Sequence, residues 1–244
     1  MPVTALLHSE WIKIRSVRAS YGSLLAVFVS TLAITLLVFA TVGRAEADNG
    51  GDTVFNAFYV INFAQIAAIS FGATAVSSEY TGGALRVSLS AVPHRSRFYA
   101  SKIAVMAVAA LAAGLAAGFT TFLVGQAFLG EYAIGLGEPG ALRACFGAGI
   151  YLTAMALFAA GLTFLLRSAV AVISLLVPFI LIVSFVVGDI AGGAAAYLPD
   201  RAGQQVLYQD PPEGPGPWAG LAVTLLWAAV SLLAGWWAVR RRDA

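Results

Sequence analysis

Long apolar stretches alternate with short charged segments along the chain. No charged residue occurs between Arg18 and Arg44, and charges bound five later stretches in the same way. Each stretch is about 20 residues or longer, enough for a helix rising 1.5 Å per residue to cross a hydrocarbon core of roughly 30 Å. The pattern therefore predicts an all-α integral membrane protein with six transmembrane helices, near residues 21–42, 54–76, 103–129, 145–166, 169–188 and 218–239.

The first 20 residues differ from the rest, because they carry too many charges to span a bilayer. An apolar stripe recurs at helical spacing and consists of Leu7, Trp11, Ile14 and Val17 or Arg18. Glu10, Lys13 and Arg15 lie mainly off this stripe. Residues 1–20 are therefore predicted to form an amphipathic interfacial helix, basic on its water-facing side and with Trp11 at the lipid headgroups. A cleaved signal peptide is disfavoured, because the apolar run 21–42 exceeds the roughly 7–15 residues of a signal core.

The composition supports a membrane domain over residues 21–244. Hydrophobic residues make up 60% of the chain and charged residues 11%, whereas soluble domains carry about 25% charged residues. The one cysteine, Cys145, excludes an intrachain disulfide and is expected to be a small buried residue. The two histidines and this cysteine do not have the spacing of a metal site.

The basic residues predict the orientation. If the N-terminus is cytoplasmic, all but three of the 14 basic residues face the cytoplasm, the exceptions being Arg44, Arg143 and Arg201. Most acidic residues then face outward: Glu46, Asp48, Asp52, Glu131, Glu138, Asp189, Asp200, Asp210 and Glu213. By the positive-inside rule, both termini are predicted to be cytoplasmic, which agrees with an even number of spans.

The segment 79–102, between the second and third spans, is the most distinctive polar part of the chain. Leu85, Leu89 and Val92 recur at offsets of four and three, which predicts a short amphipathic helix. Gly82-Gly83 precedes this helix and Pro93 follows it. A short helix held between two spans is suited to docking on another protein. The alternative is a solvated basic loop that only fixes the topology.

Polar side chains within the spans are few. Asn56, Asn62 and Gln65 lie in the second span, and the last two share a helical face. They are candidates for lining a transport pathway, and hydrogen bonding between helices is the alternative. Gly114 and Gly118 form a GxxxG pattern that predicts close helix packing, either within the subunit or across a dimer.

The segment 189–217 is the longest predicted extracellular loop. It opens with Gly192-Gly193 and ends in a run of prolines. Its sequences AAAYL and AGQQVLY are expected to form short helices resting on the membrane surface. A loop of this length is more often functional than idle, although flexible filler is the alternative.

Catalytic and energy-coupling motifs are absent from the sequence. There is no GxxxxGK[ST], HExxH or GxSxG pattern, so the chain is not expected to bind ATP or to be an enzyme. No ionisable residue lies at the centre of a predicted span, which disfavours an ion- or proton-coupled carrier. A transport function would therefore draw its energy from a separate subunit.

Two stretches resemble ABC-2 type transporter permeases, the membrane subunits of ATP-binding-cassette exporters. They are SEWIKIRSVRAS at the N-terminus and SSEYTGGALRVSLSAVPHRSRFYASK after the second span. The matching positions in the second stretch are Glu79, Tyr80, Gly83, Arg86, Leu89, Pro93, Arg95 and Lys102. This chain has Thr81 where the family often has a basic residue, which puts one electrostatic contact in doubt.

The resemblance implies a type V ABC exporter-like half-transporter in a bacterial plasma membrane. Two permease subunits, identical or different, would pair above two ATPase subunits that bind ATP and magnesium; no nucleic acid would be involved. The ATPase-coupling residues would be Glu79, Gly83, Leu85, Arg86, Leu89, Pro93, Arg95 and Arg97. The interfacial helix would contribute Glu10, Trp11, Lys13 and Arg15, and residues 189–217 would close the exit.

The resulting prediction is export of a hydrophobic or amphiphilic compound. The ATPase would press on the face formed by Leu85, Leu89 and Val92 and thereby move the second and third spans. The alternative is a membrane anchor or sensor that recruits a cytoplasmic partner without transporting anything.

Overall fold

In a computed structural model, the structure describes residues 3–41, 43, 52–92, 94–184, 186, 192–211 and 214–241. These residues form helices and no strand. Five helical segments are long and apolar enough to cross a membrane: Arg18–Thr41, Ile61–Tyr80, Arg95–Tyr132, Ala141–Leu166 and Pro217–Arg241. A shorter apolar helix covers Ala169–Ile182. The chain is therefore a multi-pass helical membrane protein, and the predicted fifth span, 169–188, stays a prediction, since residues 185 and 187–191 lie outside the described part.

Six helices match the predicted N-terminal and apolar segments. They are α1 (Val3–Ser16), α2 (Arg18–Thr41), α5 (Ile61–Ser77), α7 (Arg95–Leu129), α8 (Ala141–Leu166) and α12 (Pro217–Arg241). A short α4 (Thr53–Phe58) precedes α5, so the predicted second span is broken at Tyr59–Val60. Helix α7 begins at Arg95, well before the expected residue 103. The prediction placed Arg95–Lys102 in a loop because of their charges, but charged residues are compatible with a helix.

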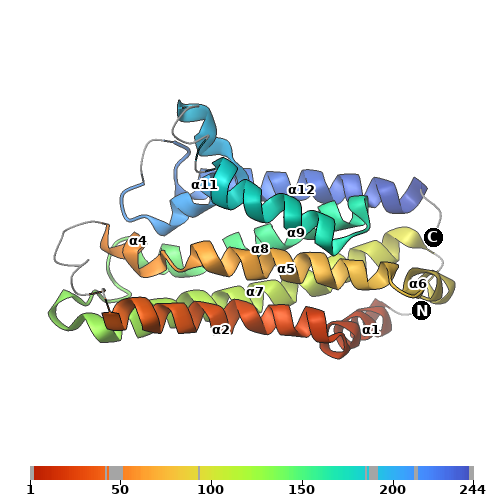
Figure 1. Cartoon of the computed structure of the whole chain (residues 1–244), viewed down its shortest axis with the longest axis horizontal. Coiled ribbons are helices and arrows are strands. Elements are labelled where there is room, and N and C mark those ends of the chain that lie inside the picture. The colour runs from red at the N-terminus through yellow and green to blue at the C-terminus, as the bar shows by residue number, and fades with distance from the viewer. Residues whose placement is uncertain are drawn as a thin grey trace.

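The long helices lie side by side in an elongated bundle, with both ends of the described chain at the same end as the short helix α6 (Ala84–Ala91) (Figure 1). Helix α8 lies at the centre and packs on α5, α7 and α12, while α2 packs on α5 and α7. Most of α8 is buried. Its central position is the reason that its sequence is apolar on all sides.

Small residues allow helix α8 to approach its neighbours closely. A Cβ atom on Gly118 of α7 would lie 2.7 Å from the carbonyl oxygen of Cys145, and one on Gly114 would lie 3.0 Å from that of Gly149. The GxxxG pattern therefore packs α7 onto α8 within the subunit, one of the two alternatives that the sequence left open. Cys145 is buried at this contact, as expected.

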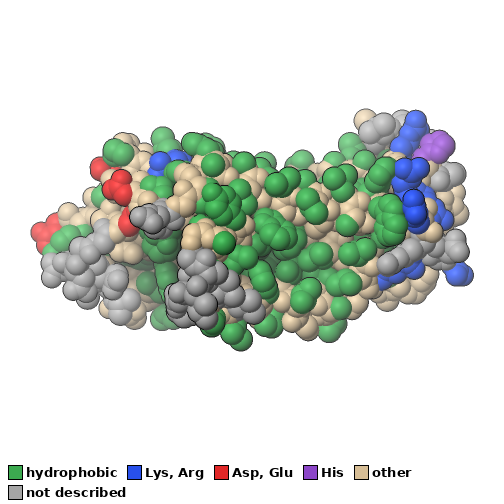
Figure 2. Space-filling model, turned by 90° about the horizontal axis from the view of Figure 1, so that it is seen from above, with side chains coloured by type: hydrophobic (Ala, Val, Ile, Leu, Met, Phe, Trp, Pro, Cys, Tyr) green, Lys and Arg blue, Asp and Glu red, His purple; other side chains and the backbone are tan. Residues whose placement is uncertain are grey.

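Charged side chains gather at the two ends of the bundle. In Figure 2, Lys, Arg and His side chains gather at one end, and Asp and Glu side chains lie at the other, where a smaller patch of Lys or Arg is also visible. We call the first the basic end, which carries α1, α6, the start of α7 and the last turn of α12. The acidic end carries Asp52, which caps the start of α4, Asp210, whose N–H donates to Asp52, and Glu131, which follows the end of α7. The separation of charge along the sequence is thus preserved in space.

The predicted hairpin between the fourth and fifth apolar stretches is present. Arg167 adopts a left-handed conformation with φ 58°, and Ser168 caps helix α9 (Ala169–Pro178) by accepting a hydrogen bond from the Ala171 N–H. Pro178 ends the regular helix, and a π-helical segment η3 (Phe179–Val183) follows it. A proline followed by a π-helical turn marks a point at which a helix bends.

Short helices do form between the fifth stretch and α12, as predicted. They are η4 (Gly192–Tyr197), α11 (Pro199–Gln204) and η5 (Gln205–Leu207). Helix α11 packs on α12 and α8, and Ala202, Val206 and Leu207 are buried. Helix α11 is therefore fixed to the bundle, and a position of these helices at the membrane surface stays a prediction, since no membrane is present. Glycine permits this packing, since a Cβ on Gly220 of α12 would lie 2.0 Å from the Ala202 carbonyl oxygen.

Candidate functional site

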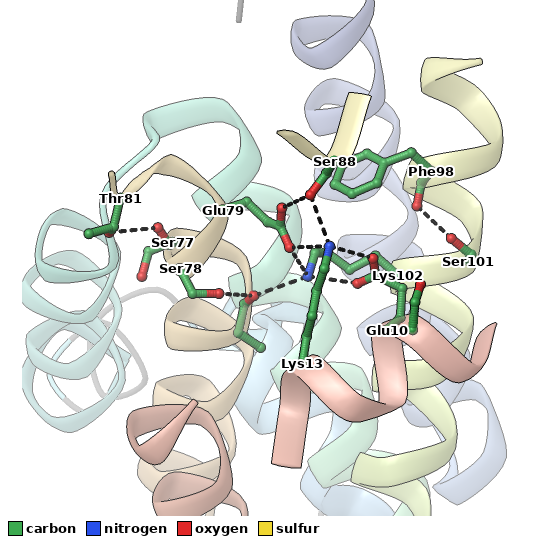
Figure 3. Close-up of polar contacts among 12 residues, drawn as sticks. Glu10, Lys13, Ser77, Ser78, Glu79, Thr81, Ser88, Phe98, Ser101 and Lys102 are labelled. Carbon is green, nitrogen blue, oxygen red and sulfur yellow. Dashed lines mark hydrogen bonds and ion pairs between the residues drawn. The ribbon is translucent and has the colours of Figure 1, made fainter. Parts of the chain in front are cut away.

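Four charged side chains meet inside the protein at the basic end and form what we call the ion-pair cluster: Glu10, Lys13, Glu79 and Lys102 (Figure 3). Lys13 Nζ lies 2.8 Å from Glu10 Oε1 and 2.9 Å from Glu79 Oε1. Lys102 Nζ lies 2.9 Å from Glu10 Oε2 and 2.9 Å from Glu79 Oε1. Each ammonium group therefore bridges the same two carboxylates.

The cluster joins segments that are distant in the sequence. Glu10 and Lys13 lie one turn apart on α1, and Glu79 lies in η1 (Ser78–Tyr80), which continues α5. Lys102 lies in the second turn of α7, and its Nζ is also 3.4 Å from the Ala75 carbonyl oxygen. The cluster thus fastens the interfacial helix to two long helices of the bundle.

Ser88 adds helix α6 to the cluster. Its hydroxyl donates to Glu79 Oε2 at 2.8 Å and accepts from Lys13 Nζ at 3.0 Å. Helix α6 also contacts η1 and α7. Displacing α6 would therefore pull directly on Glu79 and Lys13.

Burial makes the cluster energetically demanding. Glu10, Glu79 and Lys102 are each 3% exposed or less, and removing such groups from water costs several kcal/mol per ion unless each is paired. Two ammonium groups facing two carboxylates leave no net charge in the cluster. Burial alone would lower the pKa of Lys13, but Glu10 and Glu79 outweigh it, so the pKa is raised and the ammonium stays charged.

Helix α1 differs from the predicted interfacial helix in the position of its charges. We expected Glu10 and Lys13 on the water-facing side, and the structure instead turns Glu10 inward, because Lys102 lies beneath α1 and supplies its counter-charge. Trp11 and Arg15 are exposed, as a helix at the membrane surface requires. That location itself stays a prediction, since no membrane is present.

Helix α6 presents a different face from the one predicted for docking. Gly82 and Gly83 have φ of 61° and 76°, a conformation that glycine adopts without strain, and they place α6 across the basic end. Leu85 is buried, and Leu89 and Val92 are half-buried. The outward face consists of Arg86, Val87, Ser90 and Ala91. The apolar stripe that seemed available to a partner instead packs on the protein itself.

The remaining predicted coupling residues have separate surroundings. Arg95 donates a hydrogen bond from Nη1 to the carbonyl of Val239 at 2.8 Å and approaches that of Arg240 at 3.4 Å. It thereby caps the end of α12 and ties it to the start of α7. Arg97 is exposed, and Pro93 lies outside the described residues.

The three candidate pathway residues lie toward the acidic end and are largely occupied by contacts within the chain. Gln65 is buried and accepts a hydrogen bond from the Tyr151 hydroxyl of α8. Asn62 Oδ1 accepts from Gln204 Nε2 of α11 at 2.9 Å. Asn56 is half-buried. Hydrogen bonding between helices, the alternative reading, accounts for Asn62 and Gln65 in this conformation.

The geometry of the ion-pair cluster suits a mechanical role. Among the residues that the structure describes, no group of three His, Cys, Asp or Glu side chains could hold a metal ion. The ion-pair cluster instead links an exposed short helix, α6, to the ends of α1, α5 and α7. Such a linkage can pass a displacement from a partner at the basic end into the long helices.

These features define a multi-pass membrane protein whose basic end carries a helix firmly connected to the bundle. The model of the ABC-2 family transporter protein family matches residues 6–188, most of the chain, and the chain belongs to this family. The match extends from α1 to the end of the fifth apolar stretch and includes all four residues of the cluster. Members are membrane components of transport systems and not themselves catalytic enzymes. No curated protein matches the sequence significantly.

Proposed function

We propose that the chain is the permease subunit of an ATP-driven exporter in a bacterial plasma membrane, with the basic end in the cytoplasm. Family membership and the segregation of charge support this orientation, because Lys and Arg favour the cytoplasmic side. A separate ATPase subunit, in two copies that carry ATP and magnesium, supplies the energy. A second permease subunit, the same chain or a different one, completes the pathway.

The observation that carries the proposal is the attachment of α6 to the ion-pair cluster. Val87 is 71% exposed on the outward face of α6, beside Arg86 and Ser90. An ATPase groove closing on this face would displace α6. Ser88 would pass the displacement to Glu79 and Lys13, and so to α5 and α1. Because Lys102 pairs with Glu79, α7 would move with α1 and α5. The three helices would therefore shift together between an inward-open and an outward-open arrangement.

The transported compound is proposed to be hydrophobic or amphiphilic. The surfaces of α2, α9 and α12 expose mainly apolar side chains, including Leu37, Val170 and Leu226. Polar groups of the second span are few, and two of them are engaged within the chain. A charged solute would find few polar or oppositely charged groups on such surfaces to replace its hydration, whereas an amphiphile has little charge to compensate.

Substituting Val87 tests the docking surface. Val87→Glu should leave the protein inserted and folded, because the side chain is exposed, but should place a charge against the ATPase groove. In proteoliposomes containing the permease and the ATPase that co-purifies with it, we expect export-coupled ATP hydrolysis to fall about fivefold or more, the effect of losing roughly 1 kcal/mol at an interface. The control Val87→Leu keeps an apolar contact and should retain coupling.

Two results would contradict the proposal. If Val87→Glu retained the ATPase and full coupling, α6 would not be the docking helix. A non-transporting anchor would be the better interpretation in two cases: if no ATPase subunit co-purified with the wild-type protein, or if a hydrophobic solute did not stimulate ATP hydrolysis by that subunit.

A further inference from the structure

A second buried charged group, Asp200, lies far from the ion-pair cluster and plays no part in the proposed docking. Asp200 occupies the first turn of α11 and is 5% exposed. Ser184, which follows the π-helical segment η3, donates a hydrogen bond from its hydroxyl to Asp200 Oδ2 at 2.5 Å. Arg201 Nε donates to the carbonyl oxygen of Ser184 at 3.0 Å. We call Ser184, Asp200 and Arg201 the outer latch.

The outer latch joins two parts of the chain that have different attachments. Helix α11 is fixed to the bundle, because Thr224 of α12 donates to the Pro199 carbonyl at 2.7 Å and Gln204 donates to Asn62 of α5. The apolar segment that leads to Ser184 is attached less firmly. Among its described side chains before Ser184, those of Val172, Leu176 and Ile180 are buried in a narrow stripe, and Pro178 and the π-helical turn interrupt its regular hydrogen bonding. The latch therefore restrains a segment in which Pro178 and a π-helical turn allow the helix to bend.

The charge on Asp200 is poorly compensated. Asp200 Oδ1 is buried and makes no hydrogen bond of normal geometry among the described residues. The titratable groups facing Asp200 are Tyr151 from α8 and Arg201 from α11 itself. Tyr197 of η4 lies in the neighbouring segment, while α12 contributes Thr224 at this contact and carries its charged residues, Arg240 and Arg241, at the opposite end. A neutral carboxyl group costs less to bury in these surroundings than a carboxylate.

We infer that the outer latch is proton-sensitive: it holds while Asp200 is protonated and loosens when Asp200 ionises. The inference does not rest on the proposed function, because the latch belongs to this chain alone and its state is measured without substrate or ATPase. A loosened latch frees the fifth apolar helix to bend at Pro178.

The direction of the effect follows from proton linkage. Burial raises the pKa of Asp200, against the smaller opposing effects of the Ser184 hydroxyl, the backbone N–H groups of Asp200 and Arg201, and the Arg201 charge. If α11 separated from Ser184 and Asp200 met water, its pKa would return toward 3.8. The latched state therefore binds the proton more tightly. Its extra stability is complete below pH 3.8 and is lost as the pH rises through the raised pKa.

Hydrogen–deuterium exchange of the full chain in lipid nanodiscs tests the inference. Between pH 4 and pH 9, with the intrinsic pH dependence of exchange removed, protection of amides in 179–184 should fall by up to tenfold per pH unit until the pH reaches the raised pKa of Asp200, and should stay constant above it. Asp200→Asn preserves the shape and one oxygen acceptor but cannot ionise, so its protection should vary by less than about twofold. The control Asp210→Asn removes an exposed charge at the same end and should behave like the wild type.

A second variant keeps the test decisive if Asp200→Asn does not fold. The Ser184 hydroxyl lowers the pKa of Asp200, so Ser184→Ala should move the loss of protection to higher pH. The inference is overturned if Asp200→Asn shows the wild-type pH profile, or if Ser184→Ala leaves the midpoint unchanged. Protection that stays constant with pH in the wild type would overturn it as well.

Discussion

Lys102→Met should destabilise the folded protein by about 3–5 kcal/mol, the cost of breaking a buried ion pair from one side. Lys102 is 3% exposed and approaches both carboxylates of the cluster at 2.9 Å. Methionine fills a similar volume without charge, so Glu10 and Glu79 would face each other with only Lys13 between them. Denaturant-induced unfolding in detergent micelles would measure the loss.

A double variant separates the loss of charge from the loss of packing. Lys102→Met combined with Glu79→Gln restores a balance of one carboxylate and one ammonium group. It should therefore be less destabilised than the sum of the two single variants. Arg97→Met is the control, since Arg97 is exposed at the same end and should change stability by no more than about 0.5 kcal/mol. Equal stability of Lys102→Met and Arg97→Met would contradict the burial of the cluster.

Much of the fold could be predicted because apolar length alone identifies membrane helices. The long helices α2, α7, α8 and α12 lie where uninterrupted apolar runs predicted them, and the turn at Arg167 lies where one charge interrupts two such runs. The start of α7 could not be predicted in this way, since the charges of Arg95–Lys102 mark the edge of the apolar region rather than the end of the helix.

The packing of α11 against α12 and α8 could not be predicted from the sequence for a different reason. It depends on glycines at the contacts, Gly220 facing the Ala202 carbonyl and Gly203 facing the Tyr151 ring, and these contacts are visible only in three dimensions. A glycine-rich, proline-rich segment is typical of an exposed loop. Nothing in its local pattern indicates that other helices leave a space of the right shape.

The candidate site was predicted in its segments but not in its contacts. Glu79 and the short helix after Gly83 were identified from the sequence, yet periodicity shows only that Leu85 and Leu89 share a face, not what covers that face. The partnership of Glu10 with Lys102 was missed, because ion pairs between distant segments leave no local pattern. The available signal was a pair of acidic residues on segments otherwise dominated by basic ones, which suggests buried counter-charges.

The position of α8 at the centre makes its contact with α5 the most sensitive point of the bundle. Gly72 of α5 faces the backbone of Ala156, and a Cβ atom at Gly72 would lie 2.0 Å from the Ala156 carbonyl oxygen. Neither backbone can yield without moving a whole helix. Gly72→Ala should therefore separate α5 from α8 and destabilise the protein by about 1–3 kcal/mol, the usual range for overpacking.

Gly22→Ala provides the matched control for this prediction. Gly22 is exposed in α2 and a Cβ atom there has no neighbour within 4 Å, so alanine should be neutral or stabilising by about 0.5–1 kcal/mol. Thermal unfolding in detergent compares the two variants. Because α5 continues into η1 and Glu79, a displaced α5 should also weaken the coupling of ATP hydrolysis to export. Equal stability of the two variants would show that α5 and α8 do not touch at Gly72.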